Sequence, residues 1–243
     1  FKKRAGNHIP LATKQGSICF VPTMGALHAV HLSLIEKSRS PNDITVCSIF
    51  VNPLQFNNAI DLEKYPRTLP ADMNILLAAG CDILFAPEAK EMYQNETDKT
   101  LSFETGFLDA LFEGALRPGH FKGVAVVVHK LFQIVKPTDA YFGLKDYQQC
   151  MLIKKLVTDL VLPIKLHLCP TLREPNVLAR STLKAHLSLD GRQAATKIYE
   201  AMNYAHPNYS TQHNTYIEAW CKIHLSNNHS ERQAYFHNEH PKL

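Results

Sequence analysis

Short apolar segments alternate with amphipathic segments over the first 170 residues. Five short apolar runs predict buried strands at residues 17–22, 44–51, 82–87, 140–142 and 164–169. Longer stretches with helical spacing, or free of helix-breaking residues, predict helices at residues 32–40, 69–79, 123–135 and 147–160. This alternation is typical of an α/β fold with a parallel sheet, in which ligands bind at the carboxyl ends of the strands.

The pattern weakens after residue 189. A weak helix is predicted at residues 192–205 and a short strand at residues 216–223. Residues 210–243 are rich in His, Asn and Gln. We therefore expect either a small second domain or a partly ordered tail.

The composition narrows the class of protein. Apolar residues make up 45% of the 243 residues and charged residues 20%, which excludes a collagen, a coiled coil and a disordered chain. The net charge of +4 is small and dispersed, so we expect no nucleic-acid partner. No apolar run reaches the roughly 18 residues of a membrane span, and residues 1–15 lack the apolar core of a signal peptide.

The six cysteines do not form a metal-binding pattern. They show no C-x-x-C spacing, and several lie in apolar runs, so we expect buried free thiols in a reducing compartment. They are Cys19, Cys47, Cys81, Cys150, Cys169 and Cys221. The histidines near the C-terminus are irregularly spaced, so we interpret them as solvated side chains.

Two histidines follow the first predicted strand. Gly25 permits a tight turn, and a helix begins soon after it. The backbone N–H groups at a helix start attract phosphate, and His28 and His31 are three residues apart, on one helix face. Such imidazoles can donate to phosphate oxygens in phosphoryl or nucleotidyl transfer. Two alternatives are ordinary surface histidines and half of a metal site.

Polar residues also follow the other predicted strands. Asn52 and Gln55 offer amides that can bind a hydroxyl or a carboxylate, although Asn-Pro is also an ordinary turn pair. Arg117 and His120 lie in a further polar stretch, which either simply caps a loop or, by the family resemblance given below, lies near the site. Lys145 follows the fourth strand, where it can meet phosphate.

Several of these stretches, in order and at these separations, resemble the pantothenate synthetase family of ATP-dependent pantoate–β-alanine ligases. The matching stretches are FVPTMGALH (20–28), SIFVNPLQF (48–56), YPRTL (65–69), RPGHFKGV (117–124), KDYQQ (145–149) and PTLRE (170–174). They are distributed over roughly residues 20–190, which is most of the chain.

The resemblance implies a Rossmann-like parallel sheet with helices on both faces, in a nucleotide- and pantoate-binding domain of residues 1–172. It also implies a small α+β lid domain at residues 173–243, truncated relative to the family. The implied reaction joins (R)-pantoate to β-alanine through a pantoyl-adenylate, with release of AMP and pyrophosphate. Mg²⁺, a cytoplasmic location and a homodimer are also implied.

The resemblance assigns roles residue by residue. His31 is the implied proton donor, with His28 and Lys145 as further catalytic residues. Gln55 and Gln149 are implied to hold pantoate. Asp72 is implied to lie near magnesium, and the alternative is a solvated surface carboxylate, since its predicted helix has several polar positions. The residues implied to contact ATP are Met24, Gly25, Ala26, Leu27, His28, Ala29, Val30, His31, Gly143, Leu144, Lys145, Asp146, Leu172, Arg180, Ser181, Thr182 and Leu183.

Four positions depart from the family pattern. Val30 replaces the glycine of H-x-G-H, Leu144 replaces an acid, and Val177 replaces a second glycine. Leu183 replaces an arginine that holds the ATP phosphates, and losing such a charge-assisted contact costs about 1.5–3 kcal/mol. One alternative is therefore a catalytically weakened relative that still binds nucleotide or pantoate. Another is a nucleotidyltransferase that makes a dinucleotide or CDP-type product.

Overall fold

The computed structural model describes residues 16–39, 44–175 and 179, together with residues 196, 197, 199, 200 and 203. The chain divides into two compact units, Phe1–Pro170 and Thr171–Leu243. The domain boundary expected after residue 172 lies close to this division.

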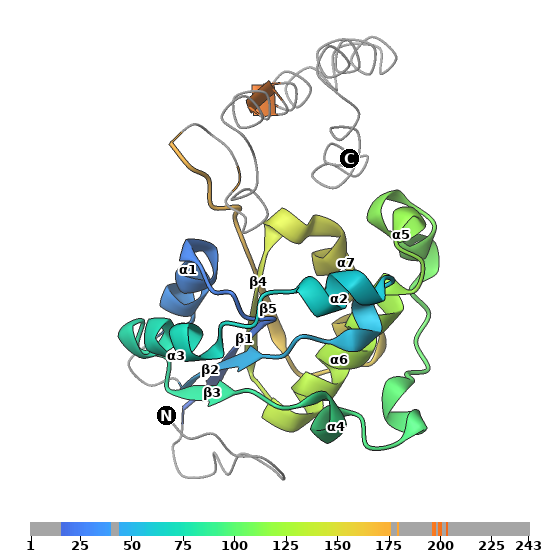
Figure 1. Cartoon of the computed structure of the whole chain (residues 1–243), viewed down its shortest axis with the longest axis horizontal. Coiled ribbons are helices and arrows are strands. Elements are labelled where there is room, and N and C mark those ends of the chain that lie inside the picture. The colour runs from blue at the N-terminus through green and yellow to red at the C-terminus, as the bar shows by residue number, and fades with distance from the viewer. Residues whose placement is uncertain are drawn as a thin grey trace. The chain divides into compact units, whose positions relative to one another are not determined.

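Among the described residues, five parallel strands form one sheet in the order β3-β2-β1-β4-β5 (Figure 1). The strands are β1 (Ile18–Thr23), β2 (Ile44–Ile49), β3 (Ile83–Phe85), β4 (Asp139–Gly143) and β5 (Lys165–Cys169). Phe20 of β1 pairs with Val46 of β2 on one side and with Ala140 of β4 on the other. The five predicted strands and their parallel arrangement are therefore confirmed.

Helices cover both faces of this sheet (Figure 1). The longer ones are α1 (Ala29–Ser38), α3 (Leu69–Ala78), α6 (His120–Val135) and α7 (Tyr147–Asp159). Helices α1 and α3 pack on the face that bears Cys19, Val21 and Cys47. Helices α6 and α7 pack on the face that bears Phe20 and Val46. Successive strand residues point to opposite faces, so each strand contributes to both cores. The predicted α/β fold is confirmed.

The sequence pattern did not predict the short helical segments between the longer elements. They are η1 (Pro53–Gln55), α2 (Ala59–Lys64), α4 (Ala89–Met92), η2 (Glu96–Lys99), η3 (Gly106–Asp109), α5 (Phe112–Leu116) and η4 (Leu144–Asp146). Each has six residues or fewer, so an apolar periodicity has less than two turns in which to show itself.

The strand order reverses between β1 and β4, which are neighbours in the sheet. After β1 the chain continues to β2 on one side, and after β4 it continues to β5 on the other. In open parallel sheets, the crevice at such a reversal is where ligands bind. The two segments that leave this crevice are residues 24–31 and residues 143–146, which the sequence predicts to bind nucleotide.

The second unit is described at only a few residues. Arg173 forms an antiparallel bridge with Ala179, and its guanidinium lies 4.5 Å from the ring centre of Tyr199. The described residues within the predicted helix 192–205 are helical, and the predicted strand 216–223 lies outside the described residues.

The prediction of buried thiols is confirmed for the cysteines that the structure describes. Cys19, Cys47, Cys81, Cys150 and Cys169 are buried free thiols, and Cys221 lies outside this part of the chain. Within the same described part, no helix combines the length and the apolar character that crossing a bilayer requires.

Candidate active site

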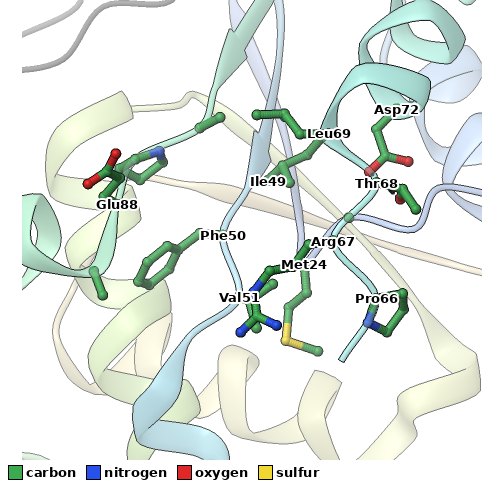
Figure 2. Close-up of a pocket in the computed structure, with 14 residues that line it drawn as sticks. Met24, Ile49, Phe50, Val51, Pro66, Arg67, Thr68, Leu69, Asp72 and Glu88 are labelled. Atoms are coloured by element: carbon green, nitrogen blue, oxygen red, sulfur yellow. Dashed lines mark hydrogen bonds between the residues drawn. The ribbon is translucent and has the colours of Figure 1, made fainter. Parts of the chain in front are cut away.

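The loop between β1 and α1 is held by a buried carboxylate. It turns at Gly25 (φ +88°) and Ala26 (φ 50°). Asp72 of α3 accepts hydrogen bonds from the backbone N–H groups of Ala26 (3.0 Å) and Leu27 (2.8 Å), and from Thr68 Oγ1 (3.0 Å). Figure 2 shows Asp72 of α3 beside Thr68, the N-cap residue of this helix. Asp72 is 2% exposed, so these three donors replace the water that the carboxylate loses on burial.

The two predicted histidines lie against each other, with ring centroids 4.3 Å apart. His28 is the N-cap of α1, and its Nδ1 accepts from the N–H of Val30 at 3.3 Å. Nδ1 of His31 accepts from the N–H of His28 at 3.2 Å. A backbone N–H can only donate, so each neutral ring carries its proton on Nε2.

The environment keeps His31 neutral. Burial is the main cause that lowers its pKa to about 4, and the neighbouring His28 acts in the same direction. Asp146 and Asp72 oppose this shift, and Lys145 adds to it. At neutral pH, His31 therefore interacts as a hydrogen-bond donor through Nε2 and not as a cation.

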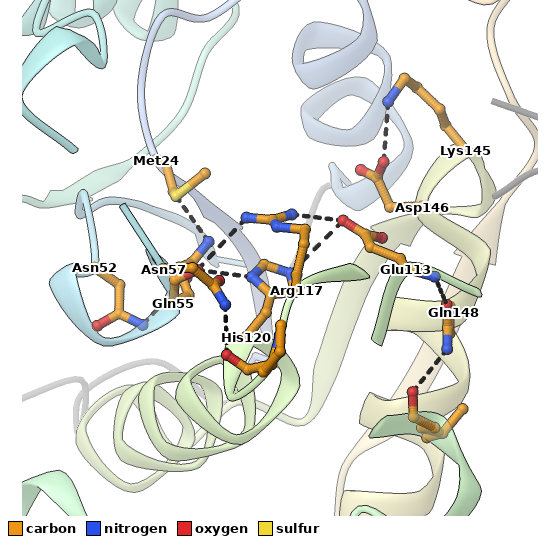
Figure 3. A network of polar contacts seen from close by, with 12 residues as sticks. Met24, Asn52, Gln55, Asn57, Glu113, Arg117, His120, Lys145, Asp146 and Gln148 are labelled. Carbon is orange, nitrogen blue, oxygen red and sulfur yellow. Dashed lines mark hydrogen bonds and ion pairs between the residues drawn. The ribbon is translucent and has the colours of Figure 1, made fainter. Parts of the chain in front are cut away.

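The end of β4 contributes a charged pair. Nζ of Lys145 lies 2.9 Å from Oδ1 of Asp146. Figure 3 shows this ion pair. Both groups influence the pKa of His31, which follows β1. The structure therefore brings together the two predicted nucleotide-binding segments, and Lys145 shares its charge with a carboxylate.

A buried amide network surrounds Gln55 in η1. Gln55 is 7% exposed, and its Nε2 donates to Sδ of Met24 at 3.0 Å. Its Oε1 accepts from Nδ2 of Asn52 at 3.1 Å. Asn52 is 1% exposed and also contacts Leu54, Tyr93 and α6. The Asn52 side chain thus connects η1 to α6 and to Tyr93, whereas the Gln55 amide contacts Met24 in the loop after β1.

Arg117 and His120 also converge on Gln55 (Figure 3). Nδ1–H of His120 donates to the Gln55 carbonyl oxygen at 2.8 Å, and Arg117 donates to the same oxygen at 3.5 Å. Glu113 pairs with Arg117 at 2.5 Å and lies 3.9 Å from Nε2 of His120. Burial lowers the pKa of His120, which is 4% exposed. Both residues predicted near the site therefore help to position η1.

Two adjacent glutamines in the first turn of α7 differ in their contacts. Gln148 is buried, donates to the carbonyl oxygens of Leu108 and Leu111 at 2.8 Å each, and accepts from the N–H of Glu113 at 3.1 Å. Gln149 is half-buried, and its amide has no hydrogen bond within the described residues. Gln148 thus anchors the α5 region, and the pantoate-binding role of Gln149 stays a prediction.

A cavity of about 380 Å³ opens at the ends of β1, β2 and β3 (Figure 2). Its walls come from Met24, Gly25 and residues 49–51, 66–69 and 86–89, and Asp72 lies at its edge. The guanidinium of Arg67 is used locally, because it donates to the carbonyl oxygens of residues 62, 63 and 65. Most of the side chains that line the cavity are apolar, and one of them is Met24, which Gln55 contacts.

Some predicted site residues are not tested by these contacts. Arg180, Ser181, Thr182 and Leu183 lie outside the described residues, and Leu172 belongs to the second unit. The described residues contain no cluster of three or more His, Cys, Asp or Glu side chains able to hold a metal ion. The magnesium role of Asp72 stays a prediction, and the alternative of a solvated surface carboxylate is wrong.

Sequence reasoning missed three residues of the site: Tyr93, Glu113 and Gln148. Tyr93 follows a helical segment of four residues and Glu113 lies in one of five residues, and neither apolar spacing nor a motif marked them. Gln148 stands beside Gln149 in the KDYQQ stretch, and only the helix geometry separates the two roles.

Comparison with known proteins identifies close relatives. The family model described as pantoate-beta-alanine ligase matches residues 3–242. The pantothenate synthetase of Cytophaga hutchinsonii is 50% identical over 190 residues, which are 78% of this chain and 66% of that protein. The chain thus matches just under two thirds of that relative's length.

Two solved structures are also similar. The pantothenate synthetase from Thermus thermophilus has a TM-score of 0.81 and 41% identity, covering 89% of this chain and 78% of that one. The pantoate-beta-alanine ligase from Francisella tularensis, solved with beta-gamma ATP and beta-alanine, has a TM-score of 0.71 and 46% identity. That match covers 77% of this chain and 71% of the Francisella chain.

Proposed function

Because the chain belongs to the pantoate–β-alanine ligase family, we propose that it condenses (R)-pantoate with β-alanine at the expense of ATP. The pantoate carboxylate attacks the α-phosphate of ATP, forming a pantoyl-adenylate and releasing pyrophosphate. The amine of β-alanine then attacks the acyl carbon, forming pantothenate and releasing AMP. The observation that carries this proposal is the meeting of the His28–His31 pair with Lys145 and Asp146 at the reversal point of the sheet.

The histidines act on phosphate in this proposal. With Nδ1 of His31 accepting a backbone N–H, the Nε2–H of this neutral ring is the group that can donate to a phosphate oxygen. Negative charge grows on the oxygens of the departing pyrophosphate, and donors fixed in advance stabilise it. A bound phosphate raises the pKa of His31, so the same ring can also supply a proton.

Lys145 supplies the positive charge. In the ligand-free chain its ammonium pairs with Asp146 at 2.9 Å. A triphosphate carries more negative charge than one carboxylate, so we expect Lys145 to turn from Asp146 to phosphate when ATP binds. Leu144 leaves this segment with one acid fewer than the family pattern.

The two glutamines recognise pantoate in this proposal. Gln55 Nε2 contacts only a weakly accepting thioether sulfur in the contacts described above, so a carboxylate or hydroxyl oxygen can replace that partner. Gln149, in the first turn of α7, offers a second amide. Two neutral amides bind a small hydroxy acid without neutralising the carboxylate that must attack ATP.

Mg²⁺ belongs to the proposal as the ion that accompanies ATP and neutralises pyrophosphate. Asp72 fits such a role only partly, because its Oδ2 accepts two hydrogen bonds and its Oδ1 accepts one. Asp146, whose side chain is 58% exposed, is a second carboxylate near His31. Mg²⁺ binds proteins mainly through one or two carboxylates plus substrate phosphates, which this pair can provide.

The homodimer, the cytoplasmic location and a lid formed by residues 173–243 are also proposed, on the family resemblance alone. Size-exclusion chromatography with light scattering measures the first of these. A mass near twice the chain's 27.4 kDa is the expected result.

The second candidate function is a weakened relative that binds nucleotide or pantoate without efficient turnover. The substitutions Val30, Leu144, Val177 and Leu183 favour it. Val30 does not strain the backbone, since it lies in the first turn of α1 and has no positive φ. Its cost is therefore limited to the volume of its side chain near the nucleotide.

A pyrophosphate-release assay with ATP, pantoate and β-alanine, each omitted in turn, tests the proposal. We expect release that requires both ATP and pantoate, and pantothenate only when β-alanine is added. Calorimetric binding of ATP without pantoate-dependent release favours the weakened relative. Pyrophosphate release with a nucleotide acceptor and not with pantoate contradicts both.

A further inference from the structure

The Asn52 side-chain amide has an orientation that the backbone determines. One end of the amide accepts from the N–H of Leu54 at 3.2 Å, and the other end donates to the carbonyl oxygen of Gly123 at 3.1 Å. A backbone N–H can only donate and a carbonyl oxygen can only accept. Oδ1 therefore faces Leu54, and Nδ2 faces Gly123.

This orientation determines that of Gln55. Nδ2 of Asn52 also lies 3.1 Å from the Gln55 amide, and Nδ2 can only donate. The Gln55 atom that faces it must be Oε1, so the NH₂ end of Gln55 faces Met24, at 3.0 Å from Sδ. Gln55 thus presents a donor, and not an acceptor, toward the end of β1.

Tyr93 completes the chain of hydrogen bonds. It follows α4, is 9% exposed, and its hydroxyl lies 2.7 Å from Oδ1 of Asn52. Since Oδ1 can only accept, Tyr93 is the donor. The Tyr93 ring lies 6.0 Å from the ring of Phe50 and 5.7 Å from Nζ of Lys130. The Tyr93 ring, and with it the hydroxyl, is therefore held in place by the residue that follows β2 and by α6.

We infer that Tyr93 and Asn52 are positioning residues that keep the donor end of Gln55 toward pantoate. The inference rests on the proposed function, because an anionic hydroxy acid is the ligand that gains from a donor at this point. A reversed Gln55 amide would point Oε1 at a carboxylate, and two acceptors repel each other.

Nuclear magnetic resonance of the ligand-free chain tests the orientation without any activity. With labelled methionine methyl groups and side-chain amides, we expect Overhauser contacts between the Gln55 NH₂ and the Met24 methyl group. We also expect slow hydrogen exchange of the Asn52 NH₂, which speeds up in Tyr93→Phe. A Gln55 NH₂ directed at Asn52 overturns the inference, whether or not the chain is a ligase.

Steady-state kinetics tests the consequence for the substrate. Tyr93→Phe removes one neutral hydrogen bond from the chain formed by Tyr93, Asn52 and Gln55. This loss should raise the KM for pantoate about 3- to 10-fold and leave the KM for ATP unchanged. In a Gln55→Ala background, Tyr93→Phe should add no further effect on pantoate affinity, because no amide remains to be oriented. Affinity in that background is measured by calorimetry with pantoate.

Tyr141→Phe is the matched control, since Tyr141 is also 9% exposed and its hydroxyl contacts Cys19. We expect it to leave the pantoate KM unchanged. The inference fails if Tyr93→Phe leaves the pantoate KM at the wild-type value, or shifts the KM of ATP and of pantoate equally. A wild-type chain that releases no pyrophosphate contradicts the proposed function instead, and the resonance experiment then decides the inference.

Discussion

Asp72 shows how one side chain prepares a site for its ligand. The loop after β1 has two residues with positive φ, one of which is alanine, a residue that rarely adopts this conformation. The hydrogen bonds from Ala26, Leu27 and Thr68 to a buried carboxylate offset that cost. The predicted ATP-binding loop therefore has its shape before ATP arrives.

Replacing Asp72 with Asn tests this role. The side-chain amide of the variant has an NH₂ group in place of one carboxylate oxygen. One backbone N–H group of the loop therefore faces this NH₂ group, and two donors cannot form a hydrogen bond. We expect the free energy of unfolding to fall by about 2–4 kcal/mol even when EDTA removes magnesium, measured by urea denaturation. Asp61→Asn, at an exposed site in the first turn of α2, is the control. Unchanged stability in EDTA, with loss only of magnesium-dependent activity, would favour the metal-ligand role.

His31 makes stability depend on pH. Its folded-state pKa of about 4 lies below the ordinary value of 6.5, so the unfolded chain takes up a proton first as the pH falls. The contribution of His31 to the free energy of unfolding is fully present above pH 6.5. It declines toward pH 4, by up to about 1.4 kcal/mol per pH unit for one group. The free energy of unfolding, measured by urea denaturation between these pH values, should change less steeply with pH in His31→Asn. The same pH dependence in the variant and in the wild type would contradict this assignment.

Among elements, the contact between η1 and α6 is a close backbone approach that supports the site. A Cβ atom at Gly123 would lie 2.2 Å from the carbonyl oxygen of Leu54. Only glycine therefore allows α6 to come near enough for Asn52 to reach the Gly123 carbonyl. The position of Gln55 depends on this contact as much as on its own hydrogen bonds.

Gly123→Ala should separate these two elements. We expect the free energy of unfolding to fall by about 1–3 kcal/mol and the pantoate KM to rise, because η1 must shift. Gly143→Ala is the control for stability: no atom lies within 4 Å of its added Cβ, and its φ is −88°. Equal melting temperatures for the two variants would show that η1 and α6 adapt without strain.

The elements that the sequence predicted are those with a repeated pattern. The strands and the four longer helices have enough residues for apolar spacing to appear, and their boundaries differ from the prediction by only a few residues. Helix α1 begins at Ala29 rather than at residue 32, because His28 caps it. The capping bond joins a side chain to the backbone, so apolar spacing does not reveal it.

For the whole molecule, the departures from the family pattern bear on the rate of the proposed ligase reaction. Val30 lies in the first unit and Leu183 in the second, so the departures from the family pattern are spread over both. The double reversion Val30→Gly with Leu183→Arg should raise turnover about 10- to 100-fold, by restoring a phosphate contact and access to the nucleotide.

Pyrophosphate release at saturating pantoate measures this gain. Val161→Arg, at a position that is 85% exposed, controls for added positive charge alone. If the turnover of the double variant equals that of the wild type, the loss of phosphate contacts does not limit the rate.

The sequence by itself determined the α/β class, the parallel sheet and the segments that carry chemistry. Apolar periodicity and short motifs involve residues that are close together in the sequence, so both can be recognised before the chain's fold is known. Only the tertiary structure decided which member of each motif forms contacts within the protein. Gln148 anchors a neighbouring segment while Gln149 does not, and Asn52 orients Gln55, because these roles depend on partners 35 to 71 residues away. Hydrogen bonds between distant segments leave no periodic trace in the sequence, so they become visible only when the chain has folded.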